Sequence, residues 1–254
     1  MRQDPCDGRE GVIRGDGDDD VKVVSTDAER RTAIYDVGRR AVRGGAVMRA
    51  RKSSPISHSV GDGLFVLESV PDTQVASSRP SGAHGGRIWT YTQDAGTYSL
   101  DTRRSSWRKE GDWALPFVGK AEHVPAVCGS EGLCFGFASI SGPLFAVNLA
   151  TATAESPPEV RGVWEEFRLP GDWRGGTSNL VHLGSGKMCI FRFFGTIPSP
   201  PMDPSGKKPD RFVVITAVEV GPGGDDGTEI KMVKHRSKRG IRRGMNRDDV
   251  VTAG

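Results

Sequence analysis

The sequence predicts an all-β fold built from antiparallel hairpins, and three observations carry that prediction. Glycine (34) and proline (16) are abundant while aromatic residues make up only 7% of the chain, which is typical of a β protein rich in turns. The apolar runs are short and bounded by glycines. A pattern also recurs in which an apolar strand ends in Asp or Asn, a polar turn follows, and a second apolar strand closes the hairpin. The copies are Thr32–Asp36 closing at Val42, Thr97–Asp101 closing at Trp107, and Pro143–Asn148 closing at Ala154.

The spacing of these copies narrows the fold further. The spacing between Asp101 and Asn148 equals the length of one blade in kelch-type or WD-type β-propellers, which is roughly 40 to 50 residues. The interval from Asp36 to Asp101 is too long for one blade and too short for two. We therefore expect a kelch-like β-propeller, complete or incomplete, with about four or five blade equivalents.

In the first part of the chain, strands are expected at 21–26, in the hairpin through Asp36, and at 59–68. Residues 1–19 are acidic and rich in glycine, and residues 240–254 form a basic tail, so we expect both ends to be disordered. A single propeller-like domain is expected over residues 20–239. Residues 71–86 have no apolar periodicity and predict a loop or the site of a deletion.

In the second part, 88–91 is expected to pair with 97–100, followed by short strands at 132–137 and 144–148. Strands are also predicted at 180–183, 187–194, 211–220 and 229–234, and the last three are expected to form a meander that is interrupted by a loop at 195–210. The tripeptide Gly-Asp-Trp occurs at 111–113 and again at 171–173. We expect most of the bulky aromatic side chains to be core, with a partner-facing position as the alternative for any one of them. They are Trp89, Trp107, Trp113, Trp164, Trp173, and the phenylalanines within 191–194.

No catalytic, cofactor-binding or metal-binding residue is predicted. Gly184-Ser-Gly-Lys187 lacks the first glycine and the final Ser or Thr of a phosphate-binding loop, so it predicts a β-turn. The five histidines have no zinc-ligand spacing, and no GxSxG elbow occurs. Glu165 and Glu166 predict a solvated turn rather than an acid/base pair. We therefore expect a protein that is not an enzyme and that needs no cofactor.

Net charge, hydropathy and cysteine content indicate the cellular compartment of the protein. The net charge is +3, no stretch of roughly 20 apolar residues could cross a membrane, and the four cysteines do not suggest a disulfide framework. These features predict an intracellular protein, cytoplasmic or nuclear. The basic run at 234–243 predicts the solvated end of a strand, with a nuclear localisation signal or a polyanion-binding patch as alternatives. We do not expect nucleic-acid or membrane binding.

Three segments, 111–125, 180–194 and 232–239, together resemble a plant family that is expanded in cereals, domain of unknown function 1668. The resemblance covers roughly residues 20–239. It implies an all-β, propeller-like fold similar to kelch and F-box-associated domains, without established activity or catalytic residues. The chain departs from the family pattern in its short stretch between residues 68 and 88 and in its tail at 240–254.

These features together predict a non-enzymatic protein-interaction module of the kelch-like propeller type. By analogy of fold alone, its unknown protein partner would be an adaptor or a substrate of a ubiquitin ligase. Two alternatives stay open from the sequence. One is a propeller enzyme with a central site, and the other is a truncated gene product with no stable function.

Overall fold

The computed structural model describes most of the chain, and nearly all of what it describes is antiparallel β-strand. The described residues are 9–14, 21–27, 29–50, 55–60, 63–68, 74–78, 86–125, 127, 132–139, 141–196, 211–224 and 229–242. The single helical element among them is η1, a 3-10 helix of three residues at Leu149–Thr151. The all-β prediction is confirmed.

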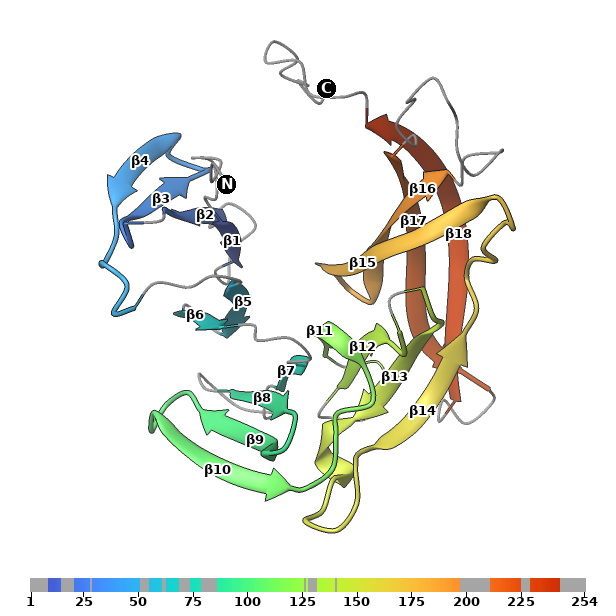
Figure 1. Cartoon of the computed structure of the whole chain (residues 1–254), viewed down its shortest axis with the longest axis horizontal. Coiled ribbons are helices and arrows are strands. Elements are labelled where there is room, and N and C mark those ends of the chain that lie inside the picture. Colours follow the sequence, from blue (N-terminus) through green and yellow to red (C-terminus); the bar gives the residue numbers. More distant parts are fainter. Residues whose placement is uncertain are drawn as a thin grey trace, which may run out of the picture. The chain divides into compact units, whose positions relative to one another are not determined.

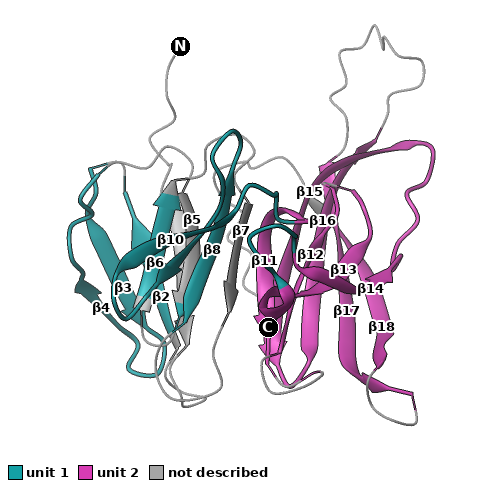
Figure 2. Ribbon diagram, turned by 90° about the horizontal axis from the view of Figure 1, so that it is seen from below, with its two compact units in different colours: residues 1–115, 152–157 teal, residues 116–151, 158–254 magenta. Residues whose placement is uncertain are grey.

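The chain divides into two compact units (Figure 2), where the sequence predicted one domain over residues 20–239. Unit 1 comprises Met1–Leu115 and Ala152–Pro157, and unit 2 comprises Pro116–Thr151 and Pro158–Gly254.

Unit 1 is built from strands that pair with their neighbours in sequence (Figure 1). A four-stranded sheet has the order β1-β2-β3-β4, a hairpin joins β5 and β6, and four more strands follow in the order β10-β9-β8-β7. The bounds are β1 Arg9–Arg14, β2 Val21–Thr26, β3 Thr32–Asp36, β4 Ala41–Gly44, β5 Pro55–Val60, β6 Gly63–Glu68, β7 Gln74–Ser78, β8 Arg87–Thr92, β9 Gly96–Asp101 and β10 Ser106–Gly111.

Unit 2 repeats the same arrangement twice. Four strands run in the order β11-β12-β13-β14, and a four-stranded sheet of longer strands has the order β15-β16-β17-β18. The bounds are β11 Val118–Val124, β12 Leu133–Phe137, β13 Leu144–Asn148, β14 Glu159–Trp164, β15 Trp173–Gly184, β16 Lys187–Thr196, β17 Arg211–Gly223 and β18 Glu229–Arg242. The predicted meander is therefore confirmed, and its last strand is longer than expected.

The first two predicted hairpins form and close where the sequence places them, as β3–β4 and β9–β10. The aspartate at the end of the first strand organises each turn. Asp36 Oδ1 accepts a hydrogen bond from the backbone N–H of Arg39 at 2.9 Å, and Asp101 Oδ1 accepts one from the N–H of Arg104 at 3.0 Å. An Asp side chain that bonds the backbone a few residues ahead stabilises the turn locally, which is why the pattern was readable in the sequence.

The third predicted hairpin is wrong in its closing strand. Asn148 does accept a hydrogen bond from the following turn, through the N–H of Ala150 at 3.0 Å, but its strand partner is Glu159 and not Ala154. The chain first makes the helix η1 and then the segment Ala152–Pro157, which belongs to unit 1. There the carbonyl of Thr153 accepts the indole N–H of Trp113 at 2.8 Å, a contact that a tight hairpin would forbid.

Three strands lie where the sequence predicted disorder or a loop. Strand β1 lies in the predicted leader, β7 lies inside 71–86, and β18 continues past residue 239. Each pairs along its length with a neighbour, β1 with β2, β7 with β8 and β18 with β17. Backbone hydrogen bonds to a neighbour are sufficient for such a strand, so apolar periodicity is a poor guide to it. The rest of the predicted leader, loop and tail lies outside the described residues.

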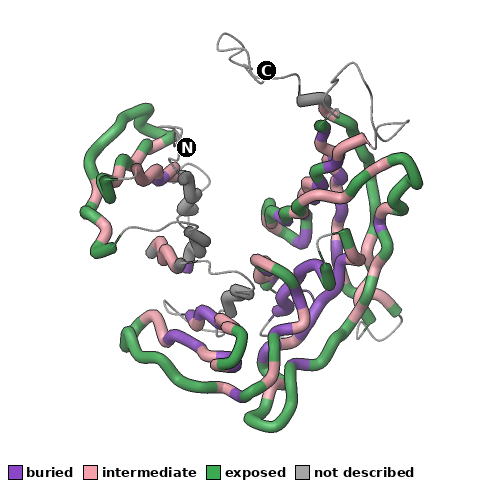
Figure 3. Tube along the Cα trace, viewed as in Figure 1, coloured by how far each residue is buried: buried purple, intermediate pink, exposed green. Residues whose placement is uncertain are grey.

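Each unit has its own hydrophobic core, and unit 2 has the larger one (Figure 3). In unit 1, Val60, Ile88 and Leu100 pack together with Phe65 and Leu67. In unit 2, buried side chains of β11 to β13 pack against one face of β15 to β17, and these are Val124, Leu133, Phe135, Phe137, Leu144, Ala146, Leu180, Met188, Ile190, Val218 and Val220. Two arrays of strands in unit 2 therefore pack face to face, and the second face of the β15–β18 sheet is not part of that core.

Candidate interaction surface

The two faces of the β15–β18 sheet follow directly from the alternation of side chains along its strands. On β17, residues 212, 214, 216, 218 and 220 are buried, whereas 213, 215, 217 and 219 between them are half-buried. The same alternation holds on β16, where residues 188, 190, 192 and 194 are buried. We call the buried side the inner face and the other side the outer face.

The inner face contains a buried ion pair between Arg192 on β16 and Glu166, which follows β14. Their side chains are 5% and 1% exposed. Glu166 Oε1 accepts hydrogen bonds from Arg192 Nε at 2.6 Å and Nη2 at 2.5 Å. The guanidinium also donates to Ser178 Oγ at 3.1 Å and to the carbonyl of Gly142 at 2.8 Å. Arg192 thus joins β15, β16, the β12–β13 turn and the segment after β14.

This pair corrects the prediction that Glu165 and Glu166 form a solvated turn. Glu165 is exposed, but Glu166 points inward because Arg192 offers it a matching charge, and Lys234 Nζ donates to its backbone carbonyl at 2.8 Å. The arginine also lies over the ring of Phe137, 4.6 Å from its centroid. A carboxylate this deeply buried requires a charged partner, so the arrangement is a structural clamp.

An aromatic cluster continues the inner face toward the far end of the sheet. Trp173 packs edge-on against Phe212 with ring centroids 4.5 Å apart, and Phe194 and Phe167 complete the cluster. The guanidinium carbon of Arg239 lies 3.8 Å from the centroid of Phe212. The second Gly-Asp-Trp therefore supplies a packing tryptophan, and a β18 arginine covers the cluster by a cation–π contact.

The outer face carries a group of apolar side chains that is only partly covered. Val181, Leu183 and Phe193 are 39%, 49% and 40% exposed. Phe193 lies opposite Val213 on the neighbouring strand, and Phe191 lies opposite Ile215, so the side chains form a continuous surface across three strands. We call this surface the outer patch, and it consists of Val181, Leu183, Phe191, Phe193, Val213 and Ile215.

Strand β18 borders the outer patch with positive charge. Its exposed cations are Lys231, Lys234, Arg236, Lys238 and Arg239, and we call them the cationic edge. Lys238 lies opposite Ile215 and Arg236 opposite Ala217, both on the outer face, whereas Arg239 lies opposite Val214 on the inner face. In the part of the chain that the structure describes, Lys231, Arg236 and Lys238 make no ion pair.

A scan of family models identifies the chain. The model described as "Protein of unknown function (DUF1668)" matches residues 12–83 and 81–240. The chain belongs to this family. No curated protein matches the chain at a significant level. The family predicted from the sequence is confirmed, and both surfaces on β15–β18 lie within the matched residues.

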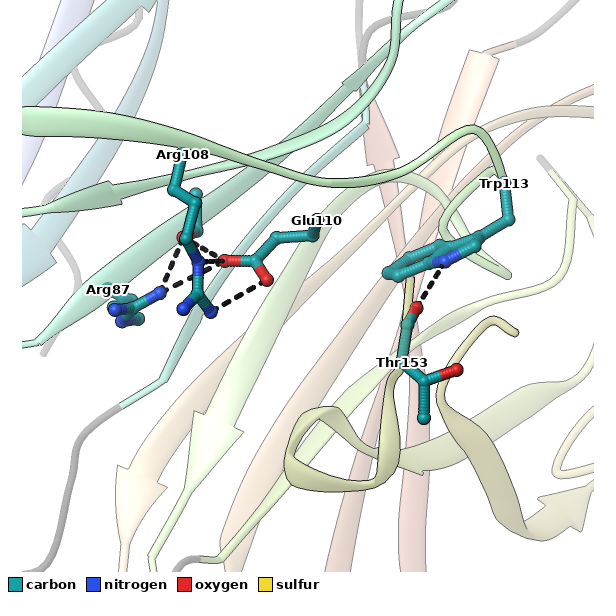
Figure 4. Close-up of polar contacts among 6 residues, drawn as sticks. Arg87, Arg108, Glu110, Trp113 and Thr153 are labelled. Atoms are coloured by element: carbon teal, nitrogen blue, oxygen red, sulfur yellow. Dashed lines mark hydrogen bonds and ion pairs between the residues drawn. The ribbon is translucent and has the colours of Figure 1, made fainter. Parts of the chain in front are cut away.

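Unit 1 of this DUF1668 chain contains a second polar cluster, centred on Glu110 of β10 (Figure 4). Its carboxylate accepts hydrogen bonds from Arg87 Nη1 at 3.0 Å, from Arg108 Nε at 3.0 Å and Nη2 at 2.8 Å, and from the hydroxyl of Ser99. These residues come from β8, β9 and β10. The bond from Ser99 joins the neighbouring strands β9 and β10, the bond from Arg87 reaches across β9 from β8, and the bonds from Arg108 lie within β10, so the cluster links all three strands.

The first Gly-Asp-Trp of the DUF1668 chain also supplies a packing tryptophan. Trp113 stacks on Trp89 with ring centroids 6.4 Å apart, and its backbone carbonyl accepts a hydrogen bond from Thr97 Oγ1 at 2.5 Å. In Figure 4 its indole nitrogen points at the carbonyl of Thr153. Each copy of the tripeptide therefore supplies a tryptophan that packs against aromatic side chains of its own unit.

The expected core role holds for some aromatic residues and not for others. Trp89 and Phe194 are buried, and Trp113, Trp164 and Trp173 are partly buried. Trp107 is 50% exposed. Of the predicted core residues, Trp107 and Phe193 are thus the exposed ones, and Phe191 is half-buried on the outer face.

The turn predicted at 184–187 is confirmed and joins β15 to β16. Ser185 and Gly186 have φ angles of 48° and 73°, and a two-residue type I′ hairpin turn requires positive φ at both positions. The carbonyl of Gly186 accepts the backbone N–H of Val220 at 2.9 Å, which ties the turn to β17. The residues that superficially resemble a phosphate-binding loop are therefore used as a turn.

Titratable residues are dispersed among the described strands. His123, His182 and His235 lie on β11, β15 and β18, and His235 Nε2 lies 3.0 Å from Glu219 Oε2. His84 lies outside the described residues. Within the ranges that the structure describes, no three His, Cys, Asp or Glu residues are grouped so as to hold a metal ion, and no helix is long and apolar enough to span a membrane.

The two described cysteines are free thiols in different surroundings. Cys134 is buried in β12, and its burial, with a smaller effect of the Glu122 carboxylate, raises the pKa of the thiol well above the ordinary value. Cys189 is half-buried on the outer face of β16. Cys6 and Cys128 lie outside the described residues.

Proposed function

We propose that this DUF1668 chain is a non-enzymatic protein-interaction module of the kelch-like propeller type, and that the outer patch is its main contact surface. The observation that carries the proposal is the apolar character of the outer face. The central strands β16 and β17 carry Phe191, Val213 and Ile215 there in half-buried positions, and Phe193 in an exposed one.

The pattern of β17 supports this use of the surface. A sheet with one solvated face alternates apolar and polar residues, whereas a sheet covered on both faces has nearly continuous apolar strands. From Phe212 to Val218, β17 has one polar residue, Thr216, and that residue points inward, where its hydroxyl bonds Ser237 Oγ at 3.0 Å. The strand has the composition of a sheet that is covered on both faces.

The exposed apolar side chains of the outer patch would contribute to the binding energy of a partner. Burying a whole Val, Leu or Phe side chain contributes about 1.5–3 kcal/mol. Val181, Leu183 and Phe193 each have 39% to 49% of their surface to bury, so these three contribute roughly 2–4 kcal/mol together. Aromatic and aliphatic groups at the centre of a contact surface supply most of the binding energy in protein interfaces.

The strand order supports the propeller type. Four antiparallel meanders of four strands, β1–β4, β7–β10, β11–β14 and β15–β18, occur along the chain, with the hairpin β5–β6 between the first two. A propeller repeats that unit and presents its loops for recognition of partners. The hairpin β5–β6 is the shorter member of the series. An adaptor or a substrate of a ubiquitin ligase stays the partner predicted from fold analogy alone.

The proposal is tested by substitution of the outer patch. Val181→Asp and Phe193→Asp place charges on the patch, and Val163→Asp is the matched control because Val163 is 61% exposed on β14 of the same unit. The three variants and the wild type are used to capture proteins from cells that express the chain, after circular dichroism shows equal folding. We expect a set of partners that the two patch variants lose and the control retains. Partners held equally by all four proteins would overturn the proposal, as would a complete absence of partners.

A further inference from the structure

We infer that the partner of this surface contributes an acidic, extended segment that pairs with the free edge of β18. This inference rests on the proposed interaction function and specifies the chemistry of the partner. Three properties of β18 carry it, namely its position at the end of a sheet, its charge on both faces, and the contrast with the strand at the other end of the same sheet.

Strand β18 has one neighbour in its sheet. It pairs with β17 from Arg211↔Arg242 to Gly223↔Glu229, and it ends the order β15-β16-β17-β18. The N–H and C=O groups on its other side pair with no strand within the described residues, although β14 contacts β18. A long edge strand of this kind is a template for a further strand, and an extended peptide that adds to it gains main-chain hydrogen bonds.

The charge on β18 determines what can add there. A strand next to β18 would place its side chains alternately on the two faces of the sheet. It would meet Arg236 and Lys238 on the outer face, and Lys234 and Arg239 on the inner face. Cations therefore lie beside the added strand on both faces, although on the inner face Lys234 also bonds the Glu166 carbonyl and Arg239 also lies over Phe212. Acidic side chains on both faces of the added strand complement this charge.

Edge protection alone does not account for these cations. Natural sheets often place a lysine on an edge strand to prevent uncontrolled pairing. Strand β15 ends the same sheet on the other side and is 12 residues long, yet Arg174 is the only Lys, Arg, Asp or Glu in its sequence. Strand β18 carries five cations between Lys231 and Arg239 and no acid in that range. The charge is thus specific to one edge.

The same charge selects between occupants. A second copy of the chain could pair β18 with β18, but like charges would then lie directly opposite one another, which is destabilising. A nucleic acid would also be attracted, but it cannot use the edge hydrogen bonds as a strand does. Side chains that stack on bases are also missing from β18, whose sequence EIKMVKHRSKRGIR contains no Phe, Tyr or Trp.

Val233 gives the segment one apolar requirement. It lies on β18 opposite Glu219, between Lys231 and Arg236, and it is 42% exposed. An apolar residue in the added strand would cover it. The partner segment is therefore acidic on both faces with an apolar residue near its centre, and the body of the partner would continue over the outer patch.

The test uses the full chain and three fluorescent peptides of about eight residues, which is within the common range of strand lengths. The first peptide is acidic with a central valine. The second has the same sequence with alternate backbone nitrogens methylated, which removes the strand hydrogen bonds and keeps the charge. The third replaces each acid by lysine. Binding is measured by fluorescence anisotropy, and a single-stranded DNA oligonucleotide serves as competitor.

We expect the acidic peptide to bind at least about tenfold more tightly than either of the others. The double substitution Arg236→Glu with Lys238→Glu should weaken that binding by about tenfold or more. Arg168→Glu is the control, because the Arg168 side chain is 89% exposed elsewhere in the same unit, and it should change the affinity less than about twofold. Strand addition would be overturned if the methylated peptide bound as tightly as the acidic peptide, or if an oligonucleotide of the same charge displaced the acidic peptide. Either result would indicate a surface that binds polyanions in general. No binding of any peptide would overturn it as well.

Failure here and failure of the proposed function give different results. Val181 lies on β15, at the opposite end of the sheet from β18. Val181→Asp should therefore leave the affinity for the short acidic peptide unchanged while it removes whole-protein partners. If the patch variants lose partners and the acidic peptide does not bind, the interaction function stands and the acidic strand is wrong.

Discussion

The buried ion pair of unit 2 makes the sharpest stability prediction. Replacing Arg192 by alanine removes both of its bonds to Glu166, at 2.6 and 2.5 Å, together with the bonds to Ser178 and Gly142. It also leaves the Glu166 carboxylate, which is 1% exposed, without its cation. Removing one partner of such a pair typically costs about 3–5 kcal/mol, because a buried charge remains unpaired.

We expect the lower end of that range for Arg192→Ala, about 3 kcal/mol. The reason is Lys234, whose Nζ already lies 2.8 Å from the backbone carbonyl of Glu166 and is the nearest replacement cation among the contacts described above. For a chain of this length, 1 kcal/mol lowers the melting temperature by roughly 2–4 °C, so the loss corresponds to roughly 6–12 °C. Arg192→Ala combined with Lys234→Met should reach the upper end of the range.

The assay is urea denaturation followed by tryptophan fluorescence, with Arg168→Ala as the control. Arg168 also pairs with a glutamate, Glu165, but both side chains are exposed, so its loss should cost less than about 0.5 kcal/mol. The double variant Glu166→Leu with Arg192→Met removes both charges and should be more stable than Arg192→Ala. A cost below about 1 kcal/mol for Arg192→Ala, or a double variant less stable than the single one, would refute the clamp.

Three further predictions concern turns and packing. Gly119 and Gly186 both have φ of 73°, so replacing either by alanine strains the backbone, and Gly119→Ala should cost about 1 kcal/mol. Gly186→Ala should cost more, because a Cβ at Gly186 meets a backbone carbonyl of β17, whereas one at Gly119 meets nothing within 4 Å. Equal losses in thermal melts would show that the contact does not matter. Trp113→Phe should cost about 0.5–1.5 kcal/mol through the lost bond to Thr153, and near-UV circular dichroism should show the loss of the stacked tryptophan pair. Hydrogen bonds from two backbone N–H groups lower the pKa of Asp101, so its contribution should be complete above the ordinary carboxyl pKa and disappear as the pH falls through the folded value; an NMR titration that gives an unshifted carboxyl would contradict this.

What the sequence predicts well is local. The hairpins closed by Asp36 and Asp101 were readable because the aspartate side chain organises the turn within a few residues. The third copy looked the same up to Asn148, and its closing strand was wrong because a distant group, the indole of Trp113, binds the segment that follows. Strand β7 was also missed, and it forms by pairing with β8, which follows it in sequence. Local chemistry predicts turns, and long-range pairing decides what they connect.

The candidate surface was only partly predictable. The basic run at 234–243 was identified and interpreted as a solvated strand end, and the structure extends strand β18 through Arg242. The burial of Glu166 could not be predicted, because its partner Arg192 is 26 residues away in sequence. The sequence of β16 does contain a sign of this buried ion pair, because Arg192 interrupts an apolar run there. An arginine at a buried position of a strand requires an acid nearby, and Glu166 is an acid that follows β14 in the same unit.

The outer face of the sheet combines apolar side chains on β17 with cations on the neighbouring strand β18. Val213 and Ile215 are apolar enough to need a cover, and an uncovered apolar sheet face promotes association with the wrong surfaces. The one acid on that face of β17, Glu219, already has His235 beside it, so the excess positive charge of Arg236 and Lys238 remains available. Those cations repel another copy of the same edge and attract an acidic segment. If another part of the same chain covered this face, apolar side chains alone would be enough to hold it. A face that binds one partner and rejects others also needs charged groups that distinguish between them.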